Sequence, residues 1–392
     1  IAKLDAFGTG IDGAIEKMRS DAAYGCTPPQ ALITKTIPIL DSILLGKPSR
    51  QPIIMALKTR TEAAGLSFRM RDLAARRAVT TLQRRVRPAL NKLRSELLGM
   101  LRNARTDAGV WALPDGPAFY AANVRTLGDT ALSPDEIHQI GLDEVTRISA
   151  DMNALLAKRG MTQGSIGARM LALAKDPANQ FADNDAGRED LLNYVRARVK
   201  DAEARYAELL PAEMIPRQAL LVKRVPIATQ ASAPGGYYDG PSLDGTRPGT
   251  YWISLRDMTA VARLRLPTLS YHEGVPGHHT QGSIAAALGE VPTLVKIASF
   301  NAYAEGWALY AERLMAELGA YQDDPLGDLG RLQDELFRAV RLVVDTGLHH
   351  KRWTREAAIA WMLDATGVAS SRVTAEIERY MAWPGQALGY KI

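Results

Sequence analysis

The 392-residue sequence contains a single cysteine, Cys26, so an intrachain disulfide cannot form. It has no run of about 18 apolar residues, which excludes a typical membrane-spanning helix. Basic residues are scattered and the net charge of +5 is small for this length, so we expect no nucleic-acid partner. No signal peptide is visible, although the first residue is Ile1 rather than Met, as expected if a leader or upstream segment has been removed.

Helical periodicity dominates the chain, and hydrophobic residues make up 46% of it, enough for a large core. Ser133, Pro134 and Glu136 carry the capping-box signature of a helix N-terminus. From residue 257 to the end the pattern is again helical, including the stretches 267–288 and 293–318. The sequence therefore predicts a mainly α protein.

One region departs from this pattern. "ALLVKRVPIAT" (219–229) and "TYWISL" (250–255) are rich in β-forming residues and flank a turn-rich loop, which predicts two strands in a small antiparallel element. We place an N-terminal helical region at 1–215 and a second region, which holds this β element and five of the six histidines, at 216–392, the two forming one continuous structural unit.

Histidine is scarce, yet three of the six histidines lie in "SYHEGVPGHHTQ" (270–281). Catalytic zinc takes three protein ligands and leaves one position open. The common solution is H-E-x-x-H on a helix, in which Glu acts as the base for the zinc-bound water. His272 and Glu273 match its first half, and Glu273 is the predicted base.

The next histidine, His278, follows at i+6, which an ideal helix would turn about 120° away from His272. Gly274, Pro276 and Gly277 disrupt helices, so a break there can return His278 to the ligand position. His279 competes for this role, and the sequence leaves the choice between the two open.

A third ligand is expected on a neighbouring helix, within "FNAYAEGWALYAERL" (300–314). Glu305 and Glu312 lie seven residues apart on one helix face, in aromatic surroundings where an unpaired carboxylate is costly. We predict Glu305 as the ligand. Glu312 is either a partner that holds a ligand histidine or a plain structural ion pair.

These motifs resemble the bacterial family known as domain of unknown function 885 (DUF885), which is placed among the zincin-type metallopeptidases. "HEGVPGHHTQ" looks like its signature, and three further stretches resemble its motifs in the same order: "DGTRPGTYWIS" (244–254), "VVDTGLHHKRWT" (343–354) and "YMAWPGQALGYKI" (380–392). The resemblance is strong over about 220–392 and weak before it. Members usually run longer, so segments are expected to be missing from this sequence.

"AEGWALYAE" is also similar to the "NEGFA-x-Y-x-E" helix of zinc aminopeptidases, in which the Glu before Gly is the third zinc ligand; that position matches Glu305. The resemblance implies a gluzincin-type helical body and a peptidase reaction, but no particular substrate. Since members are often exported, it also implies a periplasmic or otherwise exported location.

Peptide hydrolysis needs a donor for the oxyanion. The candidates are His349, Tyr380, Tyr390 and Arg247. His349 follows a potential helix break and is equally compatible with capping or packing. Arg247 is either a clamp for a substrate carboxylate or a pin for its own loop.

Substrate contacts are also predicted for Tyr237, within the turn-rich loop, and for Tyr251, directly after it. The pair Gly235–Gly236 before Tyr237 lines a cleft for extended peptide or forms a plain turn.

The sequence thus predicts a zinc metallopeptidase for short peptides, with Zn²⁺ on His272, His278 and Glu305. One alternative is a 2-His-1-carboxylate iron enzyme. Another is a non-catalytic helical binding protein with a vestigial metal site. The oligomeric state and the cleavage direction are not encoded in any pattern we recognise.

Overall fold

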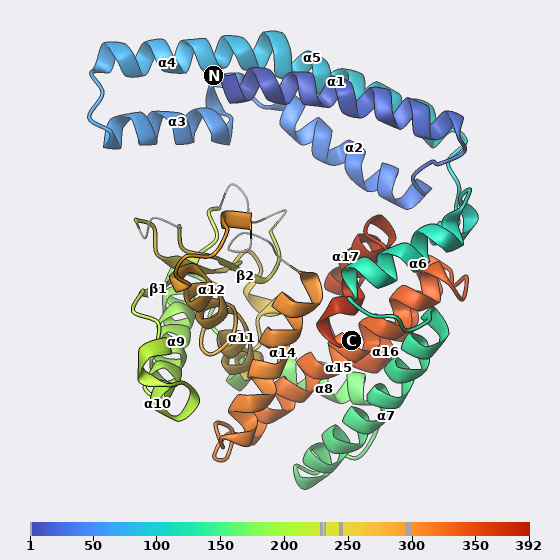
Figure 1. Ribbon diagram of the computed structural model, residues 1–392, viewed down its shortest axis with the longest axis vertical. Coiled ribbons are helices and arrows are strands. Elements are labelled where there is room, and N and C mark those ends of the chain that lie inside the picture. Colours follow the sequence, from blue (N-terminus) through green and yellow to red (C-terminus); the bar gives the residue numbers. More distant parts are fainter. Residues whose placement is uncertain (1, 228–229, 231–232, 243–245, 295–299) are drawn as a thin grey trace. The chain divides into compact units, whose positions relative to one another are not determined.

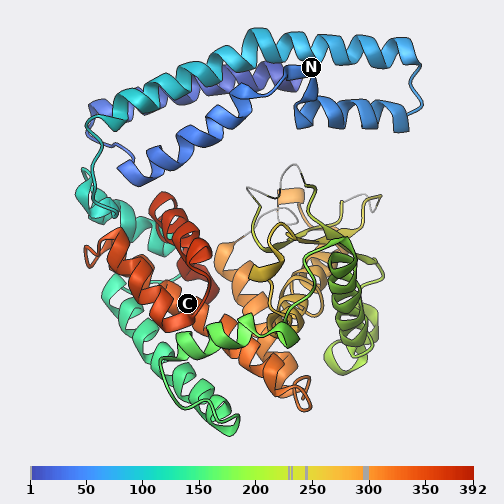
Figure 2. The same ribbon diagram turned by 180° about the vertical axis from the view of Figure 1, so that it is seen from behind.

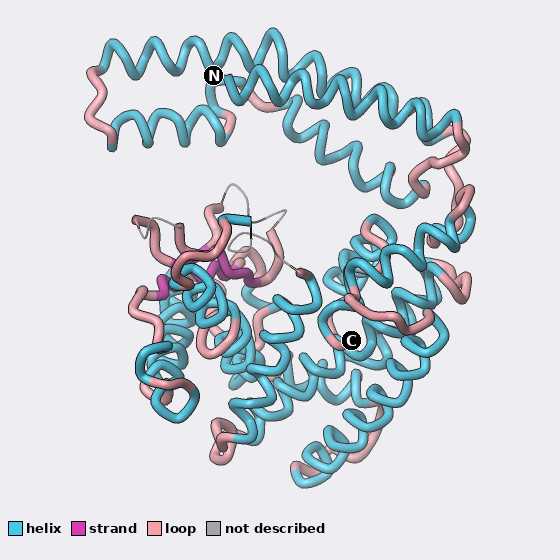
Figure 3. Tube along the Cα trace, viewed as in Figure 1, coloured by secondary structure: helices cyan, strands magenta, loops and turns pink. Residues whose placement is uncertain are grey.

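The computed structural model describes residues 2–227, 230, 233–242, 246–294 and 300–392. About 70% of the chain is helical, and the strands form one small sheet (Figure 3), so the predicted mainly α class is confirmed. The chain divides into two compact units, which we call the N-terminal unit (1–116) and the C-terminal unit (117–392). This boundary lies well before the 215/216 division expected from the sequence, because the helices that follow residue 116 pack with the sheet and the later helices.

The N-terminal unit consists of helices that pack through one aliphatic core. Its helices are α1 (Ala2–Ala23), α2 (Gln30–Leu45), α3 (Pro52–Ala63), α4 (Phe68–Thr81) and α5 (Arg87–Leu101). A π-helical turn at Leu82–Val86 joins α4 to α5. Buried Leu, Ile, Val and Ala side chains from these helices form the core, including Ile15, Ile33 and Ile54.

The C-terminal unit is larger. Its helices are α6 (Gly116–Leu127), which begins at the unit boundary, α7 (Pro134–Lys158), α8 (Ile166–Lys175), α9 (Asp185–Glu203), α10 (Tyr206–Leu209), α11 (Leu266–Glu273), α12 (His278–Ala287), α14 (Asn301–Glu317), α15 (Pro325–His349), α16 (Arg355–Thr366) and α17 (Ser370–Ala382), with a final 3₁₀ helix at Gln386–Tyr390. Residues 295–299 of the stretch predicted as helix 293–318 lie outside the described residues.

α7 and α15 lie side by side along much of their length (Figure 1). The predicted capping box starts α7: the Ser133 N–H donates to Glu136 at 2.8 Å, and the Glu136 N–H donates back to the Ser133 hydroxyl at 3.3 Å. Gly141 lets the two helices approach, since a Cβ there would lie 2.7 Å from a methyl group of Val343. α15 is buried on nearly all sides and forms the centre of the unit.

The sheet has three strands, β1 (Leu220–Arg224), β2 (Gly236–Asp239) and β3 (Gly249–Ile253), in the order β1-β3-β2. β2 pairs with β3 antiparallel, but β1 pairs with β3 in parallel. The predicted antiparallel pairing of the two β-rich stretches is therefore wrong. The turn-rich loop between them acts as a crossover and hides β2, whose Gly236–Asp239 sequence was interpreted as turn.

The sheet packs against α9 and the start of α11, and Figure 2 shows α9 beside it. Their shared core includes Val195, Val222, Tyr251 and Leu266. This packing fixes α11, which carries His272 and Glu273. No helix in the described part of the chain combines the length and apolar character needed to cross a membrane.

Candidate metal centre

The histidine motif lies at a break between two helices. α11 ends at Glu273 and α12 begins at His278, and the four residues between them form a tight turn. The Gly277 N–H donates to the carbonyl oxygen of Tyr271 at 2.9 Å. A Cβ on Gly277 would lie 2.0 Å from the carbonyl oxygen of His272, so only glycine permits this close return of the chain.

This turn places His278 beside His272. The two ring centroids are 4.8 Å apart and the rings are nearly perpendicular. The Trp307 indole N–H donates to the carbonyl oxygen of Pro276 at 3.0 Å, which ties the turn to α14. The helix that supplies Glu305 is therefore anchored to the turn that supplies His278.

The side chains of His272, His278 and Glu305 converge. Each histidine Nε2 lies 3.6 Å from the same oxygen, Oε2 of Glu305, and the three potential ligand atoms all lie within 4.8 Å of one another. Zinc bonds of about 2.0–2.1 Å at a tetrahedral angle separate two ligand atoms by about 3.4 Å. The donor set and its spacing therefore fit a zinc ion. His272 is buried, and the other two side chains are partly exposed, which leaves a side open to solvent.

Glu312 holds His272 from the other side. His272 Nδ1 donates to Oε1 of Glu312 at 2.7 Å, and Nη2 of Arg338 pairs with the same oxygen at 3.0 Å. A carboxylate behind a ligand histidine fixes the ring so that Nε2 faces the metal. Glu312 is 1% exposed, so this is a buried ion pair rather than a surface one.

The electrostatics of the cluster match its geometry. Burial by itself lowers the pKa of His272, but hydrogen bonds to Glu305 and Glu312 outweigh burial and raise that pKa to about 9. Burial raises the pKa of Glu305, and the two histidines overcome this and hold it far below its ordinary value. Without metal, the cluster thus retains a proton that a cation would displace.

Glu273 is the buried carboxylate next to the first ligand. It is 6% exposed, and its carboxylate forms no hydrogen bond or ion pair with any residue that the structure describes. Tyr251 of β3 lies nearby: burial raises the pKa of its hydroxyl well above the ordinary value, and the charge of Glu273 acts in the same direction. The Glu273 carboxylate therefore has no structural partner among the described residues.

His279, the competing ligand, faces the sheet instead. Its Nδ1 bonds the Tyr238 hydroxyl at 3.0 Å and its Nε2 bonds the carbonyl oxygen of Gln218 at 3.1 Å. Both ring nitrogens are thus occupied. His279 ties α12 to the sheet, and His278 is the residue that joins the cluster.

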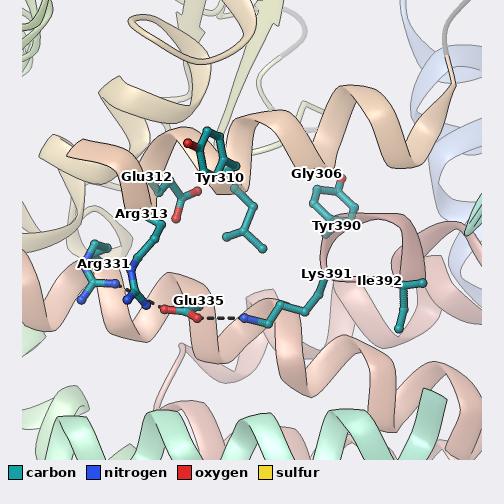
Figure 4. Close-up of a pocket in the computed structure, with 10 residues that line it drawn as sticks. Gly306, Tyr310, Glu312, Arg313, Arg331, Glu335, Tyr390, Lys391 and Ile392 are labelled. Carbon is teal, nitrogen blue, oxygen red and sulfur yellow. Dashed lines mark hydrogen bonds and ion pairs between the residues drawn. The ribbon is translucent and has the colours of Figure 1, made fainter. Parts of the chain in front are cut away.

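Tyr390 lies close to the cluster, on the final 3₁₀ helix, which packs on α14. The Arg341 guanidinium is 4.1 Å from its ring centre. Burial raises the pKa of Tyr390, Arg341 opposes this shift, and the charge of Glu305 reinforces it. A cavity of about 280 Å³ borders Tyr390, Glu312 and Gly306 (Figure 4).

His349 and Tyr380 are not brought into the cluster. The Tyr380 hydroxyl donates to Glu376 at 2.7 Å and accepts from Arg341 at 2.9 Å, all within the interior. His349 Nε2 bonds the Tyr380 carbonyl oxygen at 3.1 Å, and its ring packs on Tyr120. His349 also follows Arg338 by eleven residues on α15, which is about 16 Å along the helix.

Arg247 and Tyr237 lie near the exposed edge of the sheet. Arg247 pairs with Asp239 at 3.0 Å, and both side chains are about half exposed. Tyr237 stacks on Trp252. The sequence left two roles open for Arg247. These contacts favour the role in which Arg247 holds its own loop in place. Residues 243–245 of the same loop lie outside the described residues.

Sequence reasoning missed the arginines of α15. Arg338 lies 3.3 Å from Nδ1 of His272, and Arg341 contacts Tyr390. The sequence does contain a sign of them, because both arginines stand in an otherwise apolar stretch of α15. A buried guanidinium in such a stretch must be paired or serve a site.

Comparisons with known proteins agree with this architecture. The family model described as "Bacterial protein of unknown function (DUF885)" matches residues 1–392, so the chain belongs to the DUF885 family. That description names no activity. No curated protein matches.

Two solved structures are similar. The putative lipoprotein from Colwellia psychrerythraea is 45% identical with a TM-score of 0.96, over 99% of this chain and 66% of that one. A putative lipoprotein of unknown function from Shewanella oneidensis shares the fold, with 20% identity and a TM-score of 0.60 over 86% of this chain and 61% of that one. The chain therefore spans about two thirds or less of the length of either.

Proposed function

We propose that the C-terminal unit is a zinc-dependent hydrolase, a peptidase acting on short peptides. One observation carries the proposal: two histidine nitrogens lie 3.6 Å from one oxygen of Glu305, beside the buried and uncommitted carboxylate of Glu273. A structural zinc site has four protein ligands, whereas a catalytic site has three and an open position. Three ligands with a neighbouring base favour catalysis.

Zinc held by His272, His278 and Glu305 would supply Lewis acidity toward water and a substrate carbonyl group. Glu273 would accept the proton of the attacking water and deliver it to the leaving amine. Its burial removes competing hydration, and its lack of a structural partner leaves its oxygens available.

Glu312 would hold His272 in the ligand orientation, and Arg338 pairs with the same Glu312 oxygen. Tyr390 takes the role of oxyanion donor in this proposal, because it lies near Glu305 while its high pKa keeps the hydroxyl protonated. Tyr380 and His349 bond to other groups in the interior and would support α17 and α15.

The two similar solved structures carry the lipoprotein description, which supports an exported location for this chain as well.

The decisive experiment is elemental analysis of the purified full chain. We expect about one zinc per chain, and none in a His272→Ala/Glu305→Ala double variant. His350→Ala/Glu317→Ala is a matched control, since it removes one histidine and one glutamate from surface ion pairs with Asp135 and Arg313. Wild type without metal after zinc is supplied would overturn the proposal, and iron with oxygen-dependent turnover would favour the oxygenase alternative.

A further inference from the structure

Arginines gather in the interior of the C-terminal unit around α15 and α17. Five guanidinium groups form a connected charge cluster with three carboxylates: Arg265, Arg338, Arg341, Arg372 and Arg379 with Glu312, Asp334 and Glu376. Glu305 is left out of this count because the metal would take its charge. The cluster therefore carries an excess of positive charge in a region of low dielectric constant.

The three carboxylates already pair with other groups, although Oε2 of Glu312 has no hydrogen-bond partner. Asp334 pairs with Arg265 and lies 3.6 Å from Arg338. Glu312 pairs with Arg338 and accepts from His272.

Glu376 serves the other end of the cluster. It pairs with Arg341 at 3.1 Å and Arg379 at 2.9 Å, and it also accepts from the Tyr380 hydroxyl. No carboxylate of the cluster forms a direct ion pair with Arg372, although the charges of Asp334 and Glu376 act on it from a longer distance.

Arg372 is the unmatched member. Its side chain is half-buried, and the guanidinium forms no hydrogen bond or ion pair with any residue in the described parts of the chain. Its guanidinium lies 5.3 Å from the ring centre of Phe337. The nearby charge of Arg265, together with burial, lowers the pKa of Arg372 to about 10. A guanidinium held beside a like charge without a directly paired anion is destabilising.

Arg341 adds a second unused donor. Its Nη1 is buried without a hydrogen-bond partner. Its guanidinium lies 4.9 Å from the centre of the Phe337 ring that Arg372 also contacts, and 4.1 Å from the Tyr390 ring. Tyr390 in turn feels the charge of Glu305. Arg341 and Arg372 thus both lie near the Phe337 ring, and Arg341 also contacts the ring of Tyr390.

We propose that Arg372 and the free Nη1 of Arg341 bind a carboxylate group of the substrate. Guanidinium groups recognise carboxylates through paired N–H donors, and an anion would also offset the repulsion between Arg372 and Arg265. That the carboxylate belongs to a peptide rests on the proposed function. It is either the C-terminal carboxylate or that of an acidic side chain.

The test is calorimetric titration of the full chain in the presence of a chelator, so that no ligand can bind through zinc. The probes are acetyl-alanyl-alanine, its amide, and acetyl-aspartyl-alanine amide. We expect the first to bind at least tenfold more tightly than the amide, and Arg372→Gln to abolish that preference. Arg125→Gln, at an exposed position of α6 in the same unit, should retain it.

The outcomes separate the two sources. If acetyl-alanyl-alanine alone binds tightly, the site recognises a C-terminal carboxylate. If the aspartyl amide binds equally well, the site also accepts the carboxylate of an acidic side chain. Equal binding of acid and amide to the wild type, or no binding of any probe, overturns the proposal without the need for a variant. An unchanged preference in Arg372→Gln does so as well.

The thermal stability of Arg372→Gln adds an independent readout. Because the substitution removes a like-charge repulsion, the ligand-free variant should melt no lower than the wild type, whereas a structural role for Arg372 predicts a lower Tm. Since binding is measured without metal, a failed zinc assay would refute the hydrolase and leave the carboxylate site standing, and the converse also holds.

Discussion

The two units of this chain differ in where their charged side chains lie. In the N-terminal unit the ion pairs lie at the surface, such as Arg19 with Glu96 and Lys92 with Asp12, over a purely aliphatic core. In the C-terminal unit the central helix α15 buries Asp334, Arg338, Arg341, Asp345 and His349. Surface pairs contribute little to stability, and buried charges are costly unless paired. Among the described residues, the buried charged side chains therefore lie in the C-terminal unit.

This difference indicates where the chemistry is located. Every residue of the metal cluster, and both arginines of the proposed carboxylate site, belong to the C-terminal unit. The N-terminal unit has the simpler design of helices with one apolar face. Substitutions in matched pairs, one for each kind of environment, test whether the buried charges serve the chemistry.

The largest effect is expected for Glu273→Gln. The amide keeps the size of the side chain but cannot accept the proton of the attacking water, so kcat on the best substrate of a peptide library should fall by about 10²–10⁴-fold. Zinc content should stay at the wild-type value, because Glu273 is not a ligand. Glu62→Gln in the N-terminal unit, at an exposed pair with Arg71, is the control and should change neither quantity. Wild-type turnover in Glu273→Gln would point to the binding-protein alternative.

Asp345 should make stability depend on pH. Its buried carboxyl accepts from the Tyr120 hydroxyl at 2.7 Å and from the Gly385 N–H at 3.1 Å, and burial raises its pKa to about 7. The unfolded pKa is about 3.9, so the protonated group stabilises the fold fully below about pH 4, and this contribution is lost as the pH rises through about 7. The loss is on the order of 4 kcal/mol at most.

Asp345→Asn mimics the protonated group at every pH. Its free energy of unfolding in urea should exceed that of the wild type at pH 8 and approach it at pH 4–5. Asp143→Asn, exposed on α7 in the same unit, should follow the wild-type pH profile. Parallel profiles for Asp345→Asn and the wild type would contradict the shifted pKa.

Glu312→Gln tests the buried ion pair against a surface pair. Loss of the charge behind His272 should weaken zinc binding by about 10–100-fold, measured by competition with a chelating indicator. Glu96→Gln, which breaks the exposed pair with Arg19 in the N-terminal unit, should leave zinc affinity unchanged. Equal zinc affinities for both variants would assign Glu312 to structure alone.

Much of the fold could be predicted from local patterns. The capping box at Ser133 and the helix-breaking residues 274–277 act within a few residues, so the sequence shows them directly. The parallel pairing of β1 with β3 could not be predicted, because it depends on a crossover whose strand β2 is hidden among turn residues.

The cluster of His272, His278 and Glu305 follows from ligand chemistry and spacing, and its metal remains a prediction. The sequence did not decide between His278 and His279, since that choice depends on the Tyr238 hydroxyl and the Gln218 carbonyl oxygen, more than 40 residues away in the chain. Arg372 was missed for the same reason. Its lack of a partner is a property of the packed interior, and a single helix does not reveal it.

The smallest effects concern two mid-helix glycines, and they should have opposite signs. A Cβ at Gly141 of α7 would meet Val343 at 2.7 Å and Leu342 at 2.9 Å, so Gly141→Ala should destabilise the C-terminal unit by about 1–3 kcal/mol. Gly13 of α1 is exposed with nothing within 4 Å of the added Cβ, so Gly13→Ala should stabilise its helix by about 0.5–1 kcal/mol. Urea unfolding followed by circular dichroism measures both. A gain at both positions would mean that α7 and α15 can move apart at little cost, and the tight packing that holds the buried charges of α15 would then need another explanation.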